Sequence, residues 1–168
     1  MPNPICPSCT EEGLRPSNSS HNKILLVGDV PSDEDMSKGQ PFSDGAGIIL
    51  RKELFIAGID STKCRITNLW VHVPNKNKNC FQVGYEQVLE EAKEKEAILL
   101  FGTECVKTFT AYKINDITGL VLEPQDHVFS ASIVMFSVTP KSVFHSGVGE
   151  IRFAFRNFSQ ELSKRGLL

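Results

Sequence analysis

The sequence predicts a single-domain α/β protein: a three-layer α/β/α arrangement around a mostly parallel central sheet of about four strands. Four short apolar runs have the length and composition of buried strands, and helical patterns alternate with them. The 168 residues, 40% hydrophobic and 23% charged, suffice for one domain with a full core. No apolar run approaches the ~20 residues that span a bilayer.

The predicted strands come in order along the chain. Two of them end in glycine or lead directly into it, which is typical of a buried strand. The four runs are 23–28 (KILLVG), 65–73 (RITNLWVHV), 97–101 (AILLF) and 133–138 (IVMFSV).

Helices are predicted between these strands and after the last one. An amphipathic pattern begins at Ala46 and is closed by Gly58, strong helix formers fill 85–96, and apolar spacing marks 103–112 and 149–164. Segments 29–44 and 74–79 are expected to be polar loops. Residues 1–22, rich in Pro, Ser and Asn, are expected to be an irregular segment that a metal orders, before the domain of residues 23–168.

The five cysteines and the net charge argue against two classes of protein, those built on disulfides and those that coat nucleic acid. An odd number of cysteines, with no pattern typical of a signal peptide, argues against a disulfide framework and for an intracellular protein. Cys64 and Cys105 stand among apolar residues and are expected to be buried and unreactive. The net charge of −2 excludes a protein that coats nucleic acid by charge, but not an enzyme with a local DNA-binding patch.

The loop after the first strand reads GDVPSDEDMSKGQPFSDGAG, from Gly28 to Gly47. Ligands of open α/β sheets bind at the carboxyl ends of the strands, so this is the first place to look for a site. The loop lacks the G-x4-G-K-S/T of a P-loop and the G-x-G-x-x-G of a dinucleotide site. Composition alone leaves open a phosphate cradle and a plain surface loop.

The same segment resembles the first motif of the uracil-DNA glycosylase superfamily: Gly, an acidic residue, x, Pro, more acidic residues, then G-x-P-F-x-x-x-A-G. The closest branch is its iron–sulphur class. Further motifs match in the same order over roughly residues 6–162, at Thr67-Asn68, Leu100-Phe101-Gly102 and Gly119. The resemblance implies the glycosylase fold.

The resemblance also implies roles for particular residues. A glycosylase holds a flipped base in a closed pocket. Phe42 would stack on that base, the Asn68 amide would read its edge, and the backbone around Val30 and Pro31 would line it. Asp29, usually Glu in this class, would stabilise positive charge on the sugar and orient water. Core packing for Phe42 and capping for Asn68 and Asp29 are the structural alternatives.

The motif after the last strand departs from the family pattern. Thr139 stands where the class carries the histidine of His-Pro-Ser, and losing such a donor typically costs about 10²–10³ in rate. The Thr139 hydroxyl is a weak replacement, whereas Lys141 or His145 would supply charge from the same loop. Ser142 lies one place beyond the family serine and is expected at the substrate. Lys141 is alternatively a phosphate contact or a solvated side chain.

The metal ligands are altered as well. The class binds a [4Fe-4S] cluster through four cysteines, of which Cys6 and Cys9 match the first two and Cys80 the fourth. His72 stands at the third position. The resemblance therefore implies either an iron–sulphur cluster with one histidine ligand or a Cys3His structural Zn²⁺ site. A chain without metal is the remaining alternative.

The function expected from these features is removal of uracil, or a related base, from DNA by hydrolysis of its N-glycosidic bond in base excision repair. The partner is uracil-containing DNA, the protein is expected to be a cytoplasmic monomer (in the host if a phage encodes it), and no membrane is involved. A weak or inactive member that binds DNA or a replication or repair protein is the alternative. A nucleotide hydrolase on a similar sheet is more distant.

Overall fold

The computed structural model describes residues 3–168, apart from the side chain of Lys78. Its sheet contains β1 (Ile24–Gly28), β2 (Cys64–Asn68), β3 (Ala97–Phe101) and β4 (Ile133–Ser137). All neighbouring strands pair in parallel, in the order β2-β1-β3-β4. The predicted parallel sheet of about four strands is confirmed.

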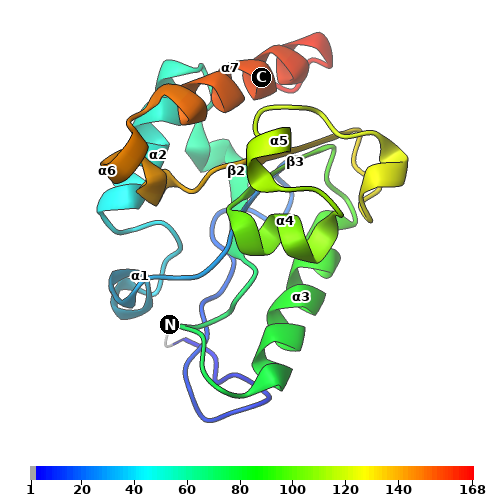
Figure 1. Ribbon diagram of the computed structural model, residues 1–168. Helices are drawn as coiled ribbons and strands as arrows, with labels where there is room; N and C mark the ends of the chain where they lie inside the picture. Colours follow the sequence, from blue (N-terminus) through cyan, green and yellow to red (C-terminus); the bar gives the residue numbers. More distant parts are fainter. Residues whose placement is uncertain (1–2) are drawn as a thin grey trace.

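Helices cover both faces of this sheet (Figure 1). The helices α2 (Gly45–Ile56) and α7 (Gly149–Lys164) pack on one face, where Leu26 and Leu99 point. On the other face, Leu25 and Ile98 point toward α3 (Lys78–Ala92), α4 (Thr103–Phe109) and α5 (Ile114–Ile117). Strand residues alternate between the two clusters because successive side chains of a strand point in opposite directions. The three-layer α/β/α prediction is confirmed.

The expectation of a long polar loop over 29–44 was wrong, because this segment contains α1 (Asp33–Lys38). The helix begins with a capping box, in which the Ser32 side chain accepts from the Asp35 amide and the Asp35 side chain accepts from the Ser32 amide. It ends at Gly39, whose φ of 66° suits glycine. The capping interactions therefore stabilise a helix in a segment whose polar composition predicts a loop.

Two predicted boundaries were also wrong. The strand predicted over 65–73 ends at Asn68, and the following residues bend away toward the N-terminal segment, where the Leu14 amide donates to the Val71 carbonyl at 2.5 Å. The helix predicted over 85–96 begins at Lys78 and ends at Ala92. It starts earlier because the Asn77 side chain caps it, so part of the expected loop at 74–79 is helical.

Shorter elements complete the chain. The helix predicted over 103–112 ends at Phe109, and the helices α5 and α6 (Val143–Ser146), four residues each, were not predicted because one turn leaves no hydrophobic period. Residues 3–22 contain no helix or strand and run along the edge of the sheet, bridging Ser17 to Ile66. No helix within residues 3–168 has the length and apolar character needed to cross a bilayer.

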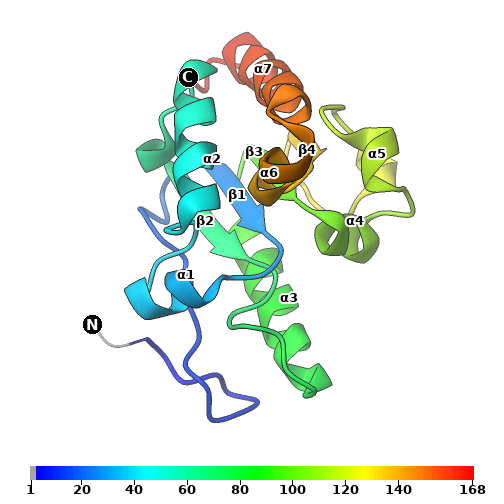
Figure 2. The ribbon, with the colours of Figure 1, turned by 60° about the vertical axis from the view of Figure 1, so that its left-hand side comes forward.

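In Figure 2, β1 ends between α1 and α6, and the connection from β4 to α7 passes the same end of the sheet. This connection contains the 3-10 turn Pro140–Ser142 and α6. Loops from β1 and β4 therefore meet at one carboxyl edge, where α/β proteins bind ligands.

Candidate active site

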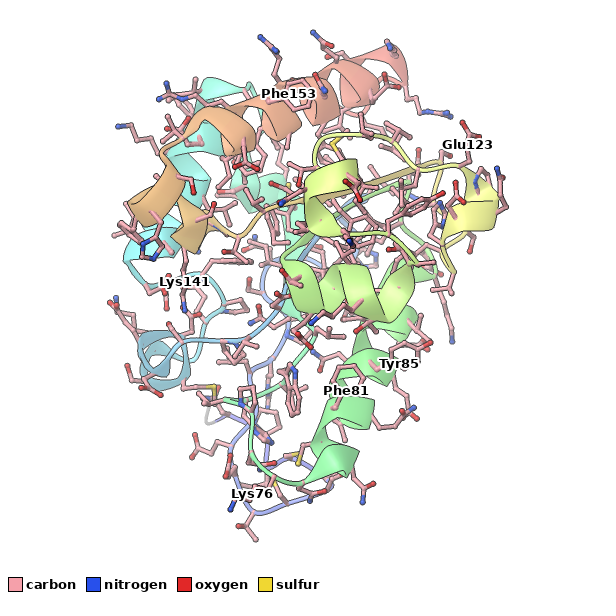
Figure 3. All side chains as sticks on the ribbon, in the orientation of Figure 1. Lys76, Phe81, Tyr85, Glu123, Lys141 and Phe153 are labelled. Atoms are coloured by element: carbon pink, nitrogen blue, oxygen red, sulfur yellow. The ribbon has the colours of Figure 1, made fainter. Side chains whose placement is uncertain are left out.

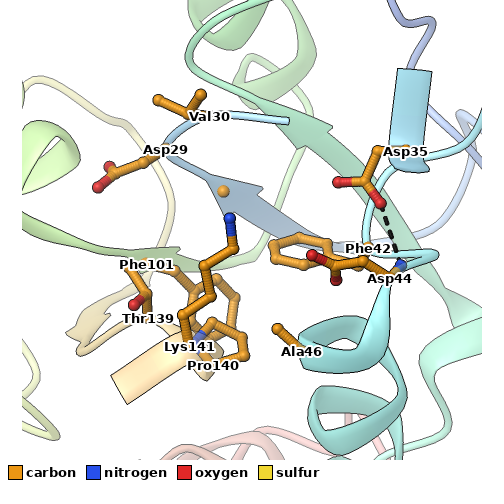
Figure 4. Close-up of a pocket in the computed structure, with 11 residues that line it drawn as sticks. Asp29, Val30, Asp35, Phe42, Asp44, Ala46, Phe101, Thr139, Pro140 and Lys141 are labelled. Atoms are coloured by element: carbon orange, nitrogen blue, oxygen red, sulfur yellow. Dashed lines mark hydrogen bonds between the residues drawn. The ribbon is translucent and has the colours of Figure 1, made fainter. Parts of the chain in front are cut away.

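A cavity of about 210 Å³ opens at this carboxyl edge (Figure 4). Its lining comes from the ends of β1, β3 and β4, from α1 and from the start of α2. The lining residues are Gly28, Asp29, Val30, Asp35, Phe42, Asp44, Ala46, Phe101, Thr139, Pro140 and Lys141. Of the side chains that the sequence predicted for substrate contact or catalysis, Asp29, Val30, Phe42, Thr139 and Lys141 are thus brought together.

Three residues converge at the back of the cavity. A Cβ on Gly28 would lie 2.2 Å from Asn68 Oδ1 and 2.7 Å from Phe42 Cζ. Such separations are far below van der Waals contact, so only glycine at position 28 allows the amide and the ring to approach the strand this closely. Asn68 is not part of the cavity lining, but it lies directly behind Gly28 at the end of β2.

The Asn68 amide is buried with an unused donor. Its residue is 4% exposed, and its Nδ2 has no hydrogen-bond partner among the described residues. A buried donor without a partner costs about 1–3 kcal/mol, and such groups are rare in folded proteins. Capping of a strand end was the structural alternative for Asn68. Its Nδ2 does not serve as such a cap, because it donates to no group among the described residues.

Phe42 is held in a strained backbone conformation, with a φ of 54°. Arg51 fixes it, since the guanidinium donates to the Phe42 carbonyl and, at 3.4 Å, to the Pro41 carbonyl. The ring packs edge-on against Phe101, with centroids 5.7 Å apart, and one side faces the cavity. Strain of this kind, at about 1–3 kcal/mol, persists where the surroundings impose it and is common at functional sites.

The Asp29 carboxylate points toward the start of α4. It accepts from the Cys105 amide at 2.7 Å and from the Glu104 amide at 3.2 Å. Gly102, the N-cap residue of α4, has no side chain to cap the helix, and a Cβ there would lie 1.9 Å from Asp29 Oδ2. Asp29 therefore caps α4 from a neighbouring strand while lining the cavity.

The position of Asp29 also affects its ionisation. Burial raises the pKa of the Asp29 carboxyl, and the hydrogen bonds from Cys105 and Glu104 offset part of this change. The nearby Glu104 carboxylate raises the pKa further. Asp29 thus takes up a proton at a higher pH than an exposed aspartate.

Two aspartates that the sequence interpretation missed shape the cavity wall. Asp35 Oδ1 accepts from the Ser43 amide at 2.7 Å, and Asp44 Oδ1 accepts from the Gly47 amide at 2.8 Å. Both carboxylates are engaged by backbone amides of the loop and of α2. The spacing Ser32-x-x-Asp35 was a visible capping signal, and Asp44 directly precedes the apolar pattern of α2.

The opposite wall comes from the loop after β4. Figure 4 shows the Lys141 side chain extending from beside Pro140 into the cavity. No hydrogen bond or ion pair joins Lys141 to another side chain in residues 3–168. Thr139 lines the same wall, and its methyl group would lie 2.7 Å from a Cβ on Gly102.

A model of the uracil DNA glycosylase superfamily matches residues 16–159 of the chain. The protein belongs to the uracil DNA glycosylase superfamily. The match covers all four strands and every lining residue of the cavity. No curated protein matches the chain.

Some predicted residues of this superfamily member lie outside the cavity lining. Pro31 is buried at the turn into α1. Ser142 ends the 3-10 turn that carries Lys141, and its amide donates to the Thr139 carbonyl at 3.0 Å. His145, on α6, borders an outer depression that shares Lys141 with the cavity. These three residues are therefore not part of the cavity wall.

The four predicted metal ligands of the glycosylase domain gather at a separate place. One ligand atom from each of Cys6, Cys9, His72 and Cys80 lies within 4.8 Å of every other. In Figure 3 the loop with Lys76, which joins His72 to Cys80, lies well away from Lys141. The group is close enough to bind a metal, and none of its residues lines the cavity.

The other two cysteines of the chain are buried in the core, as predicted. Burial raises the pKa of the Cys64 thiol to about 12 and that of the Cys105 thiol well above its ordinary value. Both side chains are fully covered and therefore stay protonated and unreactive at neutral pH.

Proposed function

We propose that the protein is a DNA glycosylase that binds a flipped uracil, or a related pyrimidine, in the cavity and hydrolyses its N-glycosidic bond. The observation that carries this proposal is the buried Asn68 Nδ2, which has no partner within the described chain. Superfamily membership supports the reaction class.

Recognition of the base rests on two side chains that meet at Gly28. The amide of Asn68 offers a donor and an acceptor together, which matches the paired carbonyl and N–H of a uracil edge. Phe42 offers a ring face to stack on the base, and its fixed backbone holds this face in place before the base arrives. Binding the base would give Asn68 Nδ2 the acceptor that it lacks.

The reaction breaks the bond between the sugar carbon C1′ and the base nitrogen. The electron pair of that bond leaves with the base, and a water oxygen forms the new bond to C1′ while its proton is released. Asp29, ionised, would stabilise the positive sugar and orient the water. It is the only carboxylate of the described cavity lining that extends beyond the end of β1 toward α4.

Lys141 takes the part of the missing histidine in this proposal. An ammonium in the cavity stabilises negative charge as it develops on the base, and no carboxylate of residues 3–168 forms an ion pair with it. Thr139 stands on the same wall but offers only a hydroxyl, which is a weaker donor to negative charge. In this proposal, the residue that stabilises the negative charge therefore lies two positions after the site of the family histidine.

A second candidate function is a member that binds uracil-containing DNA, or a repair partner, without turning over. It is favoured by one observation: the Asp29 carboxylate is already used by the Glu104 and Cys105 amides. If these bonds persist with DNA bound, fewer lone pairs of Asp29 are left to hold a water molecule, and its part in orienting water is weakened.

The two candidates are separated by mixing excess protein with single- and double-stranded oligonucleotides that contain one uracil, then cleaving abasic sites with alkali. A glycosylase converts the substrate, and Asn68→Ala slows the conversion. Asn115→Ala, an exposed position on α5, is the matched control. Binding of either DNA without conversion would support the second candidate.

The Cys6, Cys9, His72 and Cys80 group has a structural role in this proposal. It joins the N-terminal segment to the chain after β2 and to the first turn of α3. It contributes no group to the cavity lining.

A further inference from the structure

The group formed by Cys6, Cys9, His72 and Cys80 is too compact for the [4Fe-4S] cluster that resemblance to the iron–sulphur class implies. Cys6 Sγ lies 4.0 Å from Cys80 Sγ, and Cys9 Sγ lies 3.4 Å from His72 Nε2. All four ligand atoms lie within 4.8 Å of one another. The metal that fits must therefore touch all four atoms from one central point.

A single tetrahedral zinc ion meets this requirement. Zinc–sulphur bonds of about 2.3 Å and zinc–nitrogen bonds of about 2.0–2.1 Å put two sulphurs about 3.8 Å apart and a sulphur and a nitrogen about 3.5 Å apart. A four-iron cube binds each ligand to a different iron and so holds the ligand atoms roughly 6 Å apart. The sulphur–sulphur distance of 4.0 Å and the sulphur–nitrogen distance of 3.4 Å are close to those around a single ion, and the upper limit of 4.8 Å for the group is too short for the cube.

The histidine is oriented as a zinc ligand. His72 Nδ1 lies 2.8 Å from the Val73 carbonyl and 3.1 Å from Glu11 Oε2, two acceptors that hold a proton on this nitrogen. In the tautomer with its proton on Nδ1, the Nε2 lone pair is available to a metal, and this nitrogen lies beside the Cys9 sulphur. A carboxylate behind a histidine is a frequent outer partner of zinc ligands, where it fixes the ring and raises its basicity.

We propose that Cys6, Cys9, His72 and Cys80 bind one structural zinc ion in place of a four-iron cluster, with Glu11 positioning His72. The four ligands fill a closed tetrahedral site and leave no position for a substrate. The ion ties three separate segments together: residues 3–22, the bend after β2 and the start of α3. Zinc binding at such a site contributes directly to folding of the segments that it joins.

Metal analysis of the full-length protein, purified without chelators from cells supplied with both iron and zinc, tests the inference. The expected result is one zinc per chain, no acid-labile sulphide and no absorbance near ~400 nm, where iron–thiolate clusters absorb. About four irons and four sulphides per chain would overturn it. So would a folded chain that carries no metal and takes up none when titrated with Zn²⁺.

The positioning role of Glu11 is tested by zinc affinity, measured by competition with a chelator. We expect Glu11→Gln to weaken zinc binding about 10–100-fold, the usual effect of losing an outer partner. The matched control is Glu12→Gln, an exposed neighbour that forms no hydrogen bond or ion pair with His72 within residues 3–168. Equal zinc affinities for the two variants would contradict the role of Glu11.

Substitution with Co²⁺ provides a readout that does not depend on excision activity. A tetrahedral site with three thiolates gives strong cobalt–sulphur absorption, which His72→Ala should shift because one ligand is lost. An unchanged spectrum in His72→Ala would remove His72 from the site. Limited proteolysis should cut within residues 3–22 only after the metal is removed. These outcomes are independent of whether the protein excises uracil.

Discussion

Asn68 Oδ1 lies so close to the Cα of Gly28 that a methyl group on this glycine would come within 2.2 Å of it. The Phe42 ring would be 2.7 Å from the same methyl group. The end of β1 thus leaves just enough room for an amide and an aromatic ring to meet beside the cavity. This relationship makes the pocket sensitive to a single added carbon.

Gly28→Ala should strongly lower the excision rate, although this change removes no polar group from the pocket. The new methyl group must displace Asn68 and Phe42, so we expect the excision rate to fall by at least about 10²-fold, as for the loss of a positioned catalytic contact. Gly45→Ala is the matched control, because nothing lies within 4 Å of a Cβ there. Single-turnover rates of the two variants check this prediction, and equal rates would contradict it.

Lys141→Ala should lower the excision rate about 10–10³-fold, since the positive charge opposite the leaving base is lost. Thr139→His in the same variant should restore part of the rate by returning the family's donor to the wall. Lys113→Ala, at the exposed N-cap residue of α5, is the control. If Lys141→Ala reduces DNA affinity but leaves the single-turnover rate unchanged, Lys141 is a phosphate contact instead.

The excision rate should fall at acidic pH as Asp29 becomes protonated. Burial raises the Asp29 pKa above its ordinary value, so the loss begins at a higher pH than for an exposed aspartate. The rate is fully present above this raised pKa and disappears as the pH falls through it. A pH profile of single-turnover rates measures this, and Asp29→Asn should lack the acidic limb as well as most of the activity.

Stability should depend on an ion pair between α2 and α7. Arg152 Nε lies 2.7 Å from Glu53 Oε2, and Arg152 holds the pKa of the buried Glu53 carboxyl below its ordinary value. We expect Glu53→Gln to lower the free energy of unfolding by about 1–3 kcal/mol, as for a lost hydrogen bond to a charged group. Glu90→Gln, in an exposed pair, should change it little.

The sign of the pH effect follows from the lowered pKa of Glu53. The unfolded chain binds a proton at this carboxyl more readily than the folded chain, so the stabilisation is present above the unfolded pKa. It is lost as the pH falls through the folded pKa. Urea unfolding at neutral and acidic pH should show a smaller difference between wild type and Glu53→Gln at the acidic pH.

The sheet and its ligand-binding edge were predictable because they depend on local patterns. Buried strands appear as apolar runs, and the run ending at Gly28 led directly to the pocket loop. The helix α1 was missed although Ser32 and Asp35 form a capping box, because its six residues carry no apolar stripe. The end of β2 was also missed, since the residues beyond Asn68 stay apolar while packing against the N-terminal segment.

The site required information that no local pattern contains. The capping of α4 by Asp29 joins residues 75 and 76 positions apart, and it depends on a missing side chain at Gly102. That Asn68 Nδ2 has no hydrogen-bond partner among the described residues is visible only in the folded structure. The metal ligands were assigned from a family resemblance, whereas the proposal of zinc rests on the distances between their atoms, which only the structure gives.

The most direct test of the proposed function is single-turnover release of uracil from a single-stranded oligonucleotide, with protein in excess, by wild type and Asn68→Ala. The structure predicts measurable release by wild type and a rate at least about 10²-fold lower for Asn68→Ala, with both proteins folded. No release by stoichiometric wild-type protein, or equal release by the two proteins, would contradict the assignment of this cavity as a uracil-excision site.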